Sequence, residues 1–461
     1  MKSEAPEYII HCMDSYNTED VIYALATAWA KSAIAVVRAS GTGCIERLCP
    51  AVRSRHDIRK LASNTAHYCN LVDPADGKPV DDIVLTVYRD GHGYTGEEAF
   101  EISCHGGLQV VRAVLGTLSA LGFRQALPGE FTLRAFLHGK MDLTRAEAVD
   151  ELVKAQGRTG QIMALNRLNG ALFRQIDKIK DIVLDMMSIV EVQLDYSDDE
   201  IGENLDFPRE RLDEAVRGLE KLRDSYSTGR LFSQGARIVL AGPSNAGKSS
   251  LFNYFLKEER AIVSPQKGTT RDFIEAMCTV RGIPVRLYDT AGFRELSESE
   301  IEEEGIRRSR SLMDSADIVI YLADSSDFTD PDPKVLSDPR CIAVLNKTDL
   351  VDRELEGFIK LSVTTGQGFD VLCDAIYGRL TSDLEVSDDS ALVIENTRQK
   401  ENLERASSAL RRASDALDAG LPLDIVSMEI QEALEALGEL TGEVTTDDIL
   451  ERIFGSFCVG K

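Results

Sequence analysis

Residues 242–249 read Gly-Pro-Ser-Asn-Ala-Gly-Lys-Ser, the spacing of a phosphate-binding loop. The glycines of such a loop let successive backbone N–H groups turn toward phosphate oxygens, while the lysine adds positive charge and the serine hydroxyl holds Mg2+. A strand must precede the loop and a helix must follow it. Residues 237–241 form a β-branched apolar run, and residues 250–257 fit an amphipathic helix whose N-terminus faces the anion. We therefore expect a nucleotide-binding α/β domain.

A second motif, Asn346-Lys347-Thr348-Asp349, follows the strand-like run 341–345. The carboxylate of Asp349 would accept hydrogen bonds from guanine N1–H and the N2 amine, and adenine would leave it unpaired. Ser362-Val363-Thr364 stands where a last base-contacting loop is expected, with Val363 in place of the usual alanine. The two motifs predict a preference for GTP.

Two segments between these motifs match the switch regions of P-loop GTPases. Thr270 can give Mg2+ a second side-chain oxygen, Asp289 can reach the ion through water, and the Gly292 amide can contact the γ-phosphate. Such loops become ordered when that phosphate is present. The residues expected to contact GTP are Asn245, Ala246, Gly247, Lys248, Ser249, Ser250, Ser264, Thr269, Thr270, Asp289, Thr290, Ala291, Gly292, Asn346, Lys347, Asp349, Ser362 and Val363.

Phe293 follows Gly292, where Ras-like GTPases carry a glutamine that orients the attacking water. A phenyl ring cannot do this, so transition-state charge must be stabilised by another side chain, a partner or a second cation. The amide oxygen of Asn245, with backbone carbonyls of residues 264–269, could coordinate a monovalent cation there. The alternative is that Asn245 only shapes the turn.

The composition limits the possible classes of protein. A formal charge of -25 and a pI near 4.7 argue against a broad nucleic-acid-binding surface, so an RNA substrate would need local basic patches or a basic partner. The nine cysteines show no metal-type spacing, which favours reduced thiols in the cytoplasm. The first twenty residues do not resemble a signal peptide, and no apolar run is long enough to span a membrane.

Changes in sequence pattern divide the chain into regions. Strand-type runs mixed with a helical stretch at 108–121 indicate an α+β domain, and helical periodicity before and after the nucleotide-binding motifs indicates one all-α domain interrupted by the GTPase domain. The predicted regions are an N-terminal extension (1–20), an α+β domain (21–140), a first helical half (141–229), an α/β GTPase domain (230–382) and a second helical half (383–461).

Several further motifs have no role in nucleotide binding. They are Tyr94-Thr95-Gly96-Glu97, Ile102-Ser103-Cys104-His105-Gly106-Gly107, Pro128-Gly129-Glu130-Phe131-Thr132, Arg134-Ala135-Phe136-Leu137 and Phe457-Cys458-Val459-Gly460-Lys461. Together with the GTPase motifs they resemble the MnmE (TrmE) family of GTPases that modify the wobble uridine of tRNA. The resemblance spans residues 21–461.

The resemblance implies a folate-binding N-terminal domain, akin to the aminomethyltransferase of glycine cleavage, and a K+-dependent GTPase. It also implies a homodimer formed through the N-terminal domains. A flavoprotein partner, MnmG (GidA), would join it in a heterotetramer or larger complex that also binds tRNA. The product would be a carboxymethylaminomethyl or aminomethyl group on C5 of uridine 34, made with 5,10-methylene- or 5-formyl-tetrahydrofolate.

The family's functional residues map onto this chain by motif. The implied folate contacts are Arg38, Glu101, Lys140 and Lys461; the K+ positions are Asn245, Ser264, Gln266 and Thr269; and the Mg2+ positions are Ser249 and Thr270. Glu302 falls where the family keeps a glutamate that orients water through a bridge, so Glu302, Thr270 and Gly292 are the expected catalytic residues. Glu302 could instead belong to a solvated helix start. Cys458 has either an active or a structural role, or is a small buried residue.

Residues 27–33 depart from the family pattern. Family members carry a Pro- and Gly-rich loop before the strand with Arg38, but this chain reads Thr-Ala-Trp-Ala-Lys-Ser-Ala. Trp29 and the lost glycines would change how closely the backbone approaches a ligand, so we expect weaker or altered folate binding. Cys104 and His105 are adjacent, but neighbouring residues on a strand point to opposite faces, so we expect no nucleophilic pair.

Two other classes of function stay open at this point. One is a GTP-driven switch in ribosome assembly, or in another process that involves RNA, without one-carbon chemistry. The other is a folate-dependent aminomethyltransferase in which GTP is only regulatory.

Overall fold

The computed structural model describes residues 18–195, 207–258, 274–289, 313–331, 333–382 and 393–461. Contacts within the chain divide it into two compact units. The first contains residues 1–150, 173–180 and 434–461, and the second contains residues 151–172 and 181–433. Both units therefore combine stretches that are far apart in the sequence.

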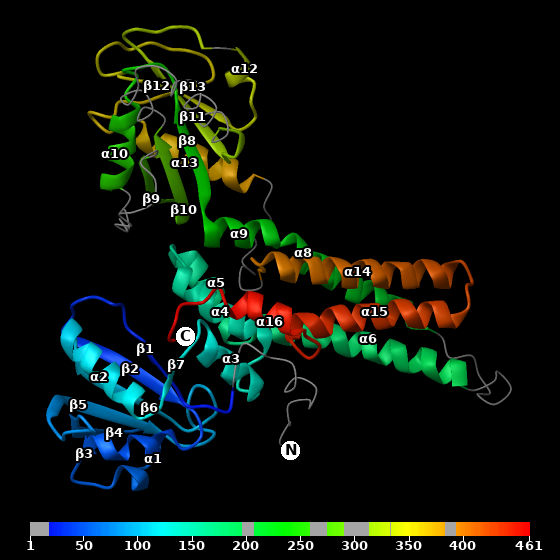
Figure 1. The fold of residues 1–461 in the computed structure, drawn as a ribbon. Helices are drawn as coiled ribbons and strands as arrows, with labels where there is room; N and C mark the ends of the chain where they lie inside the picture. Colours follow the sequence, from blue (N-terminus) through cyan, green and yellow to red (C-terminus); the bar gives the residue numbers. More distant parts are fainter. Residues whose placement is uncertain (1–17, 196–206, 259–273, 290–312, 332, 383–392) are drawn as a thin grey trace, which may run out of the picture. The chain divides into compact units, whose positions relative to one another are not determined.

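The first unit is built on a seven-stranded sheet with the order β3-β4-β5-β6-β2-β1-β7 (Figure 1). Its strands are β1 (Ile22–Leu25), β2 (Ile34–Ser40), β3 (Val52–Arg53), β4 (Thr65–Val72), β5 (Pro79–Tyr88), β6 (Ala99–His105) and β7 (Arg124–Gln125). Neighbouring strands are antiparallel except β1 and β7, which are parallel.

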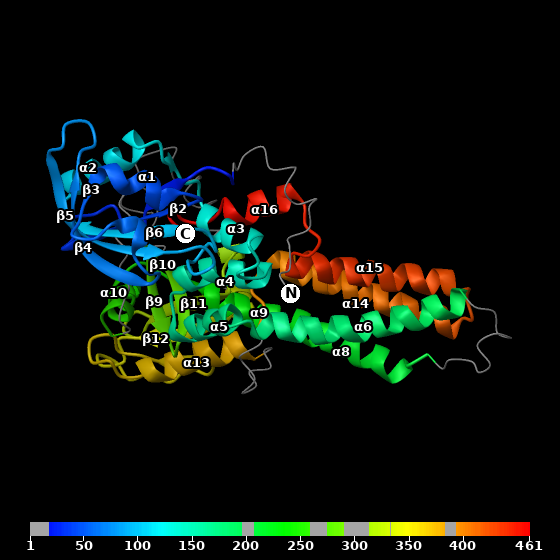
Figure 2. The ribbon, with the colours of Figure 1, turned by 90° about the horizontal axis from the view of Figure 1, so that it is seen from below.

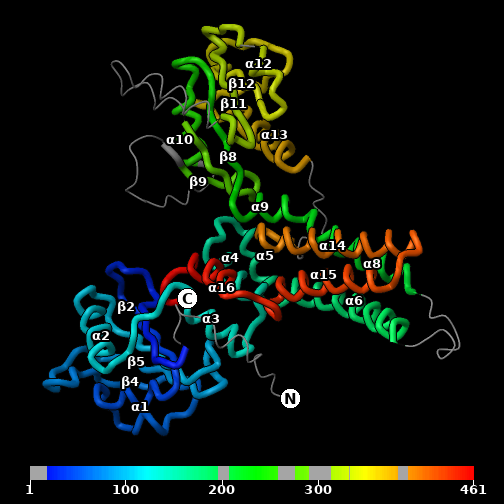
Figure 3. The backbone as a smooth tube through the Cα atoms, turned by 45° about the vertical axis from the view of Figure 1, so that its right-hand side comes forward, coloured from blue at the N-terminus to red at the C-terminus, as the bar shows by residue number. Residues whose placement is uncertain are grey.

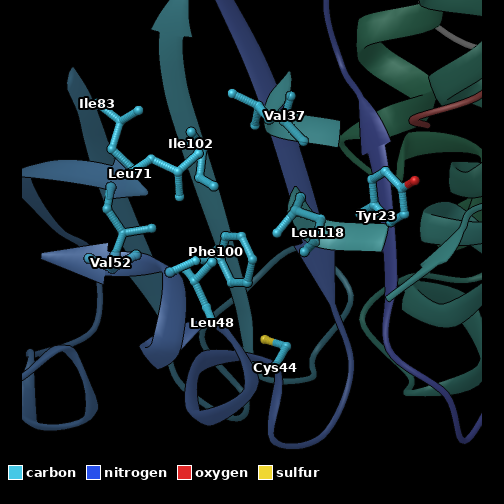
Figure 4. Close-up of a cluster of buried hydrophobic side chains, with 14 of the residues drawn as sticks. Tyr23, Val37, Cys44, Leu48, Val52, Leu71, Ile83, Phe100, Ile102 and Leu118 are labelled. Atoms are coloured by element: carbon cyan, nitrogen blue, oxygen red, sulfur yellow. The ribbon is translucent and has the colours of Figure 1, made fainter. Parts of the chain in front are cut away.

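One face of this sheet forms the core of the first unit. In β5, Ile83, Leu85 and Val87 are buried, while the residues between them are more exposed, as expected for a half-buried strand. Helices α1 (Cys44–Leu48) and α2 (Leu108–Ala120) cover the buried face, and Figure 4 shows their side chains packed among those of the strands. The opposite face is mixed: it carries Arg38 and Glu101 as well as exposed apolar residues such as Ile34 and Val84.

The chain's last residues also belong to the first unit. Helix α16 (Asp447–Phe454) packs beside α3 (Glu130–Leu137), as Figure 3 shows. Gly129 has a φ of 67°, and a Cβ there would lie 2.6 Å from the Phe454 carbonyl oxygen, so only glycine permits this approach. A β-bridge joins Pro128 to Val459. The unit also contains the 3-10 helices η2 (Cys49–Ala51) and η3 (Ile58–Lys60) and the start of α4 (Leu143–Lys154).

The second unit contains a six-stranded sheet with the order β13-β12-β11-β8-β10-β9. Its strands are β8 (Ala236–Ala241), β9 (Ile274–Val280), β10 (Ile283–Asp289), β11 (Ile318–Asp324), β12 (Cys341–Asn346) and β13 (Phe358–Lys360). All pairs are parallel except β9 with β10. Helices α10 (Lys248–Glu258) and α13 (Phe369–Thr381) pack on the same face, where the rings of Phe255 and Phe369 are 4.8 Å apart; α12 spans Pro333–Leu336.

Helices flank this α/β domain in the sequence on both sides. They are α5 (Arg158–Leu168), α6 (Ala171–Asp195), α8 (Arg209–Asp224), α9 (Tyr226–Gln234), α14 (Thr397–Asp418) and α15 (Leu423–Thr441). Helix α8, before the domain, lies beside α14, after it (Figure 2). Arg209 pairs with Asp418 at 2.8 Å across these two helices, and Arg411 pairs with Glu220. The expected all-α domain in two sequence halves is therefore present.

A buried arginine ties the segment after the GTPase domain to the preceding helices. Arg167 on α5 donates to the Val393 carbonyl at 2.6 Å and to Glu151 at 2.8 Å, and it also pairs with Glu395. Its side chain is only 1% exposed. Next to it, the Ile394 amide donates to the Ser225 hydroxyl at 3.1 Å. Among helices in the described ranges, none is long and apolar enough to cross a membrane.

Candidate functional site

The phosphate loop leaves β8 and leads directly into α10, as the sequence predicts. Its conformation depends on glycine at two positions. Gly242 has a φ of 133°, and a Cβ there would lie 2.1 Å from the Leu322 carbonyl oxygen; Gly247 has a φ of 98° and lies against the Asn346 amide. Asn245, between them, is exposed and also has a positive φ of 65°. The side chain of Asn245 is thus presented on the open side of the loop.

Lys248 and Ser249 occupy the first turn of α10. The Lys248 ammonium donates to the carbonyl oxygens of Gly242 at 3.0 Å and Pro243 at 2.8 Å, which holds it inside the loop. The Ser249 hydroxyl donates to Asp289 at 2.7 Å. Asp289 ends β10, which is paired in parallel with β8 and therefore delivers its carboxylate to the same edge of the sheet. A hydroxyl and a carboxylate are hard oxygen ligands of the kind that Mg2+ prefers.

Asn346 joins the phosphate loop to the guanine-binding loops. Its buried amide donates to the Ala246 carbonyl at 2.9 Å, and its amide oxygen accepts from the Val363 backbone N–H at 3.3 Å. One side chain therefore fixes the positions of three loops that are remote in sequence. The Asp349 carboxylate is exposed and accepts from the Ser362 hydroxyl at 2.7 Å, which limits the rotation of that carboxylate.

Asp324 is a residue of this site that the motifs do not identify. It ends β11 beside Asn346 at the end of β12, and it pairs with Lys347 at 2.6 Å. Burial raises the pKa of the Asp324 carboxyl, but hydrogen bonds from Lys347 and Ser326 outweigh that effect and lower the pKa to about 2. Asp324 is therefore ionised at neutral pH and anchors the lysine of the guanine motif. The only sequence signal was a carboxylate at the end of a buried run.

Several predicted residues lie outside the described part of the chain. They are Ser264, Gln266, Thr269, Thr270, Thr290, Ala291, Gly292, Phe293 and Glu302. Their roles stay predictions, as does that of the exposed Ser250.

A second polar cluster lies on the open face of the first unit's sheet. Arg38 on β2 stands opposite Glu101 on β6, and their side chains pair at 2.9 Å. The other Arg38 amino group donates to the Gly460 carbonyl at 3.3 Å, and its guanidinium lies 5.7 Å from the Phe131 ring. Tyr88 donates to Glu101 at 3.3 Å; burial and the nearby carboxylate raise the pKa of Tyr88. Tyr88 was not predicted from the sequence.

The other candidate folate residues have separate contacts. Lys140 is exposed and donates to the Gly91 carbonyl at 3.0 Å. Lys461 closes a turn by donating its backbone N–H to the Cys458 carbonyl at 3.3 Å. Cys458 itself is exposed, so it is not a small buried residue. Phe457, just before it, and Gly460, two residues after it, are buried, so the thiol is held at the surface by anchored residues on both sides.

The departures from the family pattern can be placed in the fold. Trp29 is 51% exposed beside the Arg112 guanidinium, and it lines a cavity of about 290 Å3 together with Tyr23, Leu115 and Val459.

Cys104 is buried and His105 is exposed, as alternation along β6 predicts, and burial raises the pKa of Cys104 to about 11.

Family models and known relatives match this chain over most of its length. Residues 143–458 match the model for the MnmE helical domain, and residues 21–140 match that for the GTP-binding protein TrmE N-terminus. A tRNA modification GTPase MnmE from Carboxydothermus hydrogenoformans is 37% identical over 96% of this chain and 100% of its own length. The corresponding protein from Borrelia recurrentis is 38% identical over 97% of this chain and 99% of its own.

A solved structure, the G domain of the T. maritima FeoB iron transporter, is 26% identical over 31% of this chain and 98% of its own, with a TM-score of 0.24. The two family models and the near full-length relatives together show the family of this chain. The chain belongs to the MnmE family of tRNA modification GTPases.

Proposed function

We propose that this chain hydrolyses GTP in a K+-dependent reaction and, with the flavoprotein MnmG, modifies C5 of wobble uridine 34 in tRNA with a tetrahydrofolate one-carbon donor. The added group would be carboxymethylaminomethyl or aminomethyl. GTP binding and hydrolysis would move the GTPase domains of a homodimer together and apart and so control the modification site. The observation that carries the proposal is the connection made by Asn346 between the phosphate loop and the guanine loops.

Because Asn346 makes this connection, recognition of the nucleotide would depend on several loops at the same edge of the sheet. The loop amides and Lys248 would bind the phosphates, while Asp349 would bind the guanine edge, and Asn346 holds the two ends in register. A purine that fails to satisfy Asp349 would leave a carboxylate unpaired, which costs about 1–3 kcal/mol or more. This supports selection of GTP over ATP.

The residues present fit the two cations that the proposal requires. The Ser249 hydroxyl lies 2.7 Å from Asp289, which would reach Mg2+ through water, and Asn245 offers an exposed amide oxygen on the same loop. When bound, Mg2+ and K+ would supply positive charge that stabilises the charge developing on the phosphoryl oxygens. Ser249 would hold Mg2+ together with Thr270, and Asn245 would hold K+ together with Ser264, Gln266 and Thr269. Glu302 would orient the attacking water.

The polar cluster around Arg38 fits a folate-like ligand. Arg38 Nε is a buried donor without a partner among the described residues, so the cluster still has a polar group to satisfy. Glu101 would accept from ring N–H groups, and the cationic side chains of Lys140 and Lys461 would face anionic parts of the ligand. Cys458, exposed near the Arg38–Gly460 contact, would then stand beside the one-carbon site. Trp29 supports altered affinity rather than loss of the site.

The modification role is tested by nucleoside mass analysis of tRNA from a strain that lacks this gene. We expect wobble uridines without the C5 substituent, and their restoration by the wild-type gene. Unchanged wobble uridines would overturn the modification role and favour a GTPase switch in ribosome assembly. Modification that persists when hydrolysis is blocked would favour an aminomethyltransferase in which GTP is only regulatory.

The cation mechanism is tested by GTP hydrolysis in K+ and in Na+. The variants Asn245→Ala and Asn245→Gly should both lose stimulation by K+, because both lack the amide oxygen. The glycine variant keeps the positive φ of 65° without strain, so it separates the ligand from the turn. If Asn245→Gly keeps its stimulation by K+, Asn245 only shapes the loop.

A further inference from the structure

A basic segment of the first unit stands out in this acidic protein. Residues 21–140 contain 13 Lys and Arg against 11 Asp and Glu, whereas the rest of the chain contains 39 against 66. Within residues 53–60, four side chains are Arg or Lys and one is Asp. The exposed members are Arg53, Arg55, His56, Arg59 and Lys60, which we name the basic patch.

The fold holds this segment in one conformation. Ile58 and Leu61 are buried in the core, so the residues around them point outward. Arg89 at the end of β5 donates to the carbonyl oxygens of Ile58, Arg59 and Leu61 at 2.6–3.2 Å, and it pairs with Glu98 at 2.9 Å. These hydrogen bonds hold the backbone of the segment in place. A loop held in this way loses little conformational entropy when its side chains bind a ligand.

The cations of the patch differ in how far they are already paired. Arg59 pairs with Asp57 at 2.8 Å and with Glu46 at 3.6 Å, and it therefore belongs to the local structure. Arg53 donates one N–H to the Pro50 carbonyl at 3.1 Å. Within the described part of the chain, neither Arg55 nor Lys60 has an ion pair. Arg53, Arg55 and Lys60 are therefore available to bind an anion.

Aromatic rings accompany these cations. Arg53 stands opposite Asn70 on β4, so it shares a sheet face with Tyr68, two residues away, whose side chain is 66% exposed. His56 lies 6.4 Å from the His67 ring. Guanidinium groups match phosphate geometry, and exposed rings stack on unpaired bases, so the combination fits RNA better than an acidic protein surface.

We infer that the basic patch binds the phosphate backbone of the substrate RNA, with Tyr68 stacking on an unpaired base. This inference rests on the proposed function, which makes tRNA the substrate. It gives an acidic chain a defined RNA contact, which its overall charge does not suggest.

The test compares binding of fluorescent tRNA, lacking the C5 modification, to the full chain at rising salt. The triple variant Arg53→Gln, Arg55→Gln, Lys60→Gln leaves Arg59 and its ion pairs intact. Each lost phosphate contact should flatten the slope of log Kobs against log salt by about 0.7–0.9, or about 2–3 for the triple variant, and weaken binding about tenfold or more at 0.1 M salt. Tyr68→Ser should weaken binding without changing that slope.

The matched control is Lys78→Gln, Lys178→Gln, Arg217→Gln, which removes the same charge from exposed positions elsewhere. We expect the control to bind tRNA within about twofold of the wild type. GTP hydrolysis should be unchanged in both triple variants, because none of the six substituted residues lies in the GTPase domain. Equal tRNA binding by the patch variant and the control would overturn the inference.

Two further outcomes separate this inference from the proposed function. If the patch variant loses the flavoprotein partner but keeps tRNA, the patch is a protein-docking surface and the inference is wrong. If the gene deletion abolishes the wobble-uridine modification and the patch variant restores that modification fully, the proposed function stands and the patch inference fails. If the deletion leaves them unchanged, the proposed function fails, whatever the patch binds.

Discussion

Replacing the buried Arg167 by methionine should loosen the helices around it without disturbing the first unit. Arg167 is 1% exposed and neutralises Glu151 and Glu395, whose side chains are only 13% and 7% exposed. Arg167→Met removes this cation from the buried Glu395 and from the mostly buried Glu151. Removing one partner of a buried ion pair costs about 3–5 kcal/mol, because the remaining charge keeps its desolvation penalty.

Hydrogen exchange followed by mass spectrometry measures this cost locally in the intact chain. Peptides from α5 and from residues 393–400 should exchange about 10²- to 10⁴-fold faster in Arg167→Met, whereas peptides from β4 and β5 should not change. Arg217→Met, at an exposed position on α8, is the control and should cost less than about 0.5 kcal/mol.

A rescue variant distinguishes unpaired charge from lost packing. Adding Glu151→Gln and Glu395→Gln to Arg167→Met removes both stranded charges, so the triple variant should exchange more slowly than Arg167→Met alone. The reasoning is refuted if Arg167→Met behaves like Arg217→Met, or if neutralising the two carboxylates restores nothing.

Three further predictions concern the two candidate sites. Gly247→Ala places a side chain on a residue with a φ of 98°, and its Cβ would lie 2.3 Å from the Asn346 amide. GDP affinity measured by fluorescence should therefore fall by about 2–4 kcal/mol. Gly378→Ala on α13 is the control, because its Cβ meets open space, and it should leave GDP affinity unchanged. The folded-state pKa of Asp324 is depressed, so the stabilisation from its lysine partner is present above the unfolded pKa near 4 and disappears as pH falls toward about 2. In denaturation of the GTPase domain, Asp324→Asn should lose this decrease of stability between about pH 4 and pH 2. Iodoacetamide at pH 7.5 should label the exposed Cys458 much faster than the buried Cys104, as peptide mass analysis would show; equal labelling would contradict the surface position of the Cys458 thiol.

The sequence predicts those parts of the site whose conformation depends only on residues that are close together in the sequence. A glycine-rich loop between an apolar run and a helix needs no distant information, and the structure confirms β8, the loop and α10 there. Alternation along β6 likewise places Cys104 inside and His105 outside. The order of the motifs was sufficient to predict the GTPase domain, because each motif follows the strand that positions it.

Partners across long sequence distances could not be predicted in the same way. Arg38 meets Gly460 after 422 residues, and Arg167 meets Glu395 after 228. Lys347 meets Asp324 only because β11 and β12 are neighbours in a fixed parallel register. Each contact depends on how elements pack, and the sequence around either partner contains no signal for the other.

The phosphate end of the GTPase sheet and the helices of the second unit are connected through two adjacent strands. Strand β8 begins directly after α9, and β10 begins at Ile283, which is buried against Met163 and Phe232 of the helices. A Cβ on Gly235 would lie 2.7 Å from the Pro284 carbonyl oxygen, so the two strand starts are in close contact. The other ends carry the phosphate loop and Asp289.

Because five residues of β10 pair with β8 and seven pair with β9, β10 cannot shift at its Asp289 end without breaking ladder hydrogen bonds or moving its Ile283 end. A shift of β10 that keeps its ladders intact would therefore also move Ile283 within its helical contacts. Val393, which packs in the same cluster as Ile283, also accepts the hydrogen bond from Arg167. The ion pairs of Arg167 thus stabilise the helical end of the connection whose other end binds GTP.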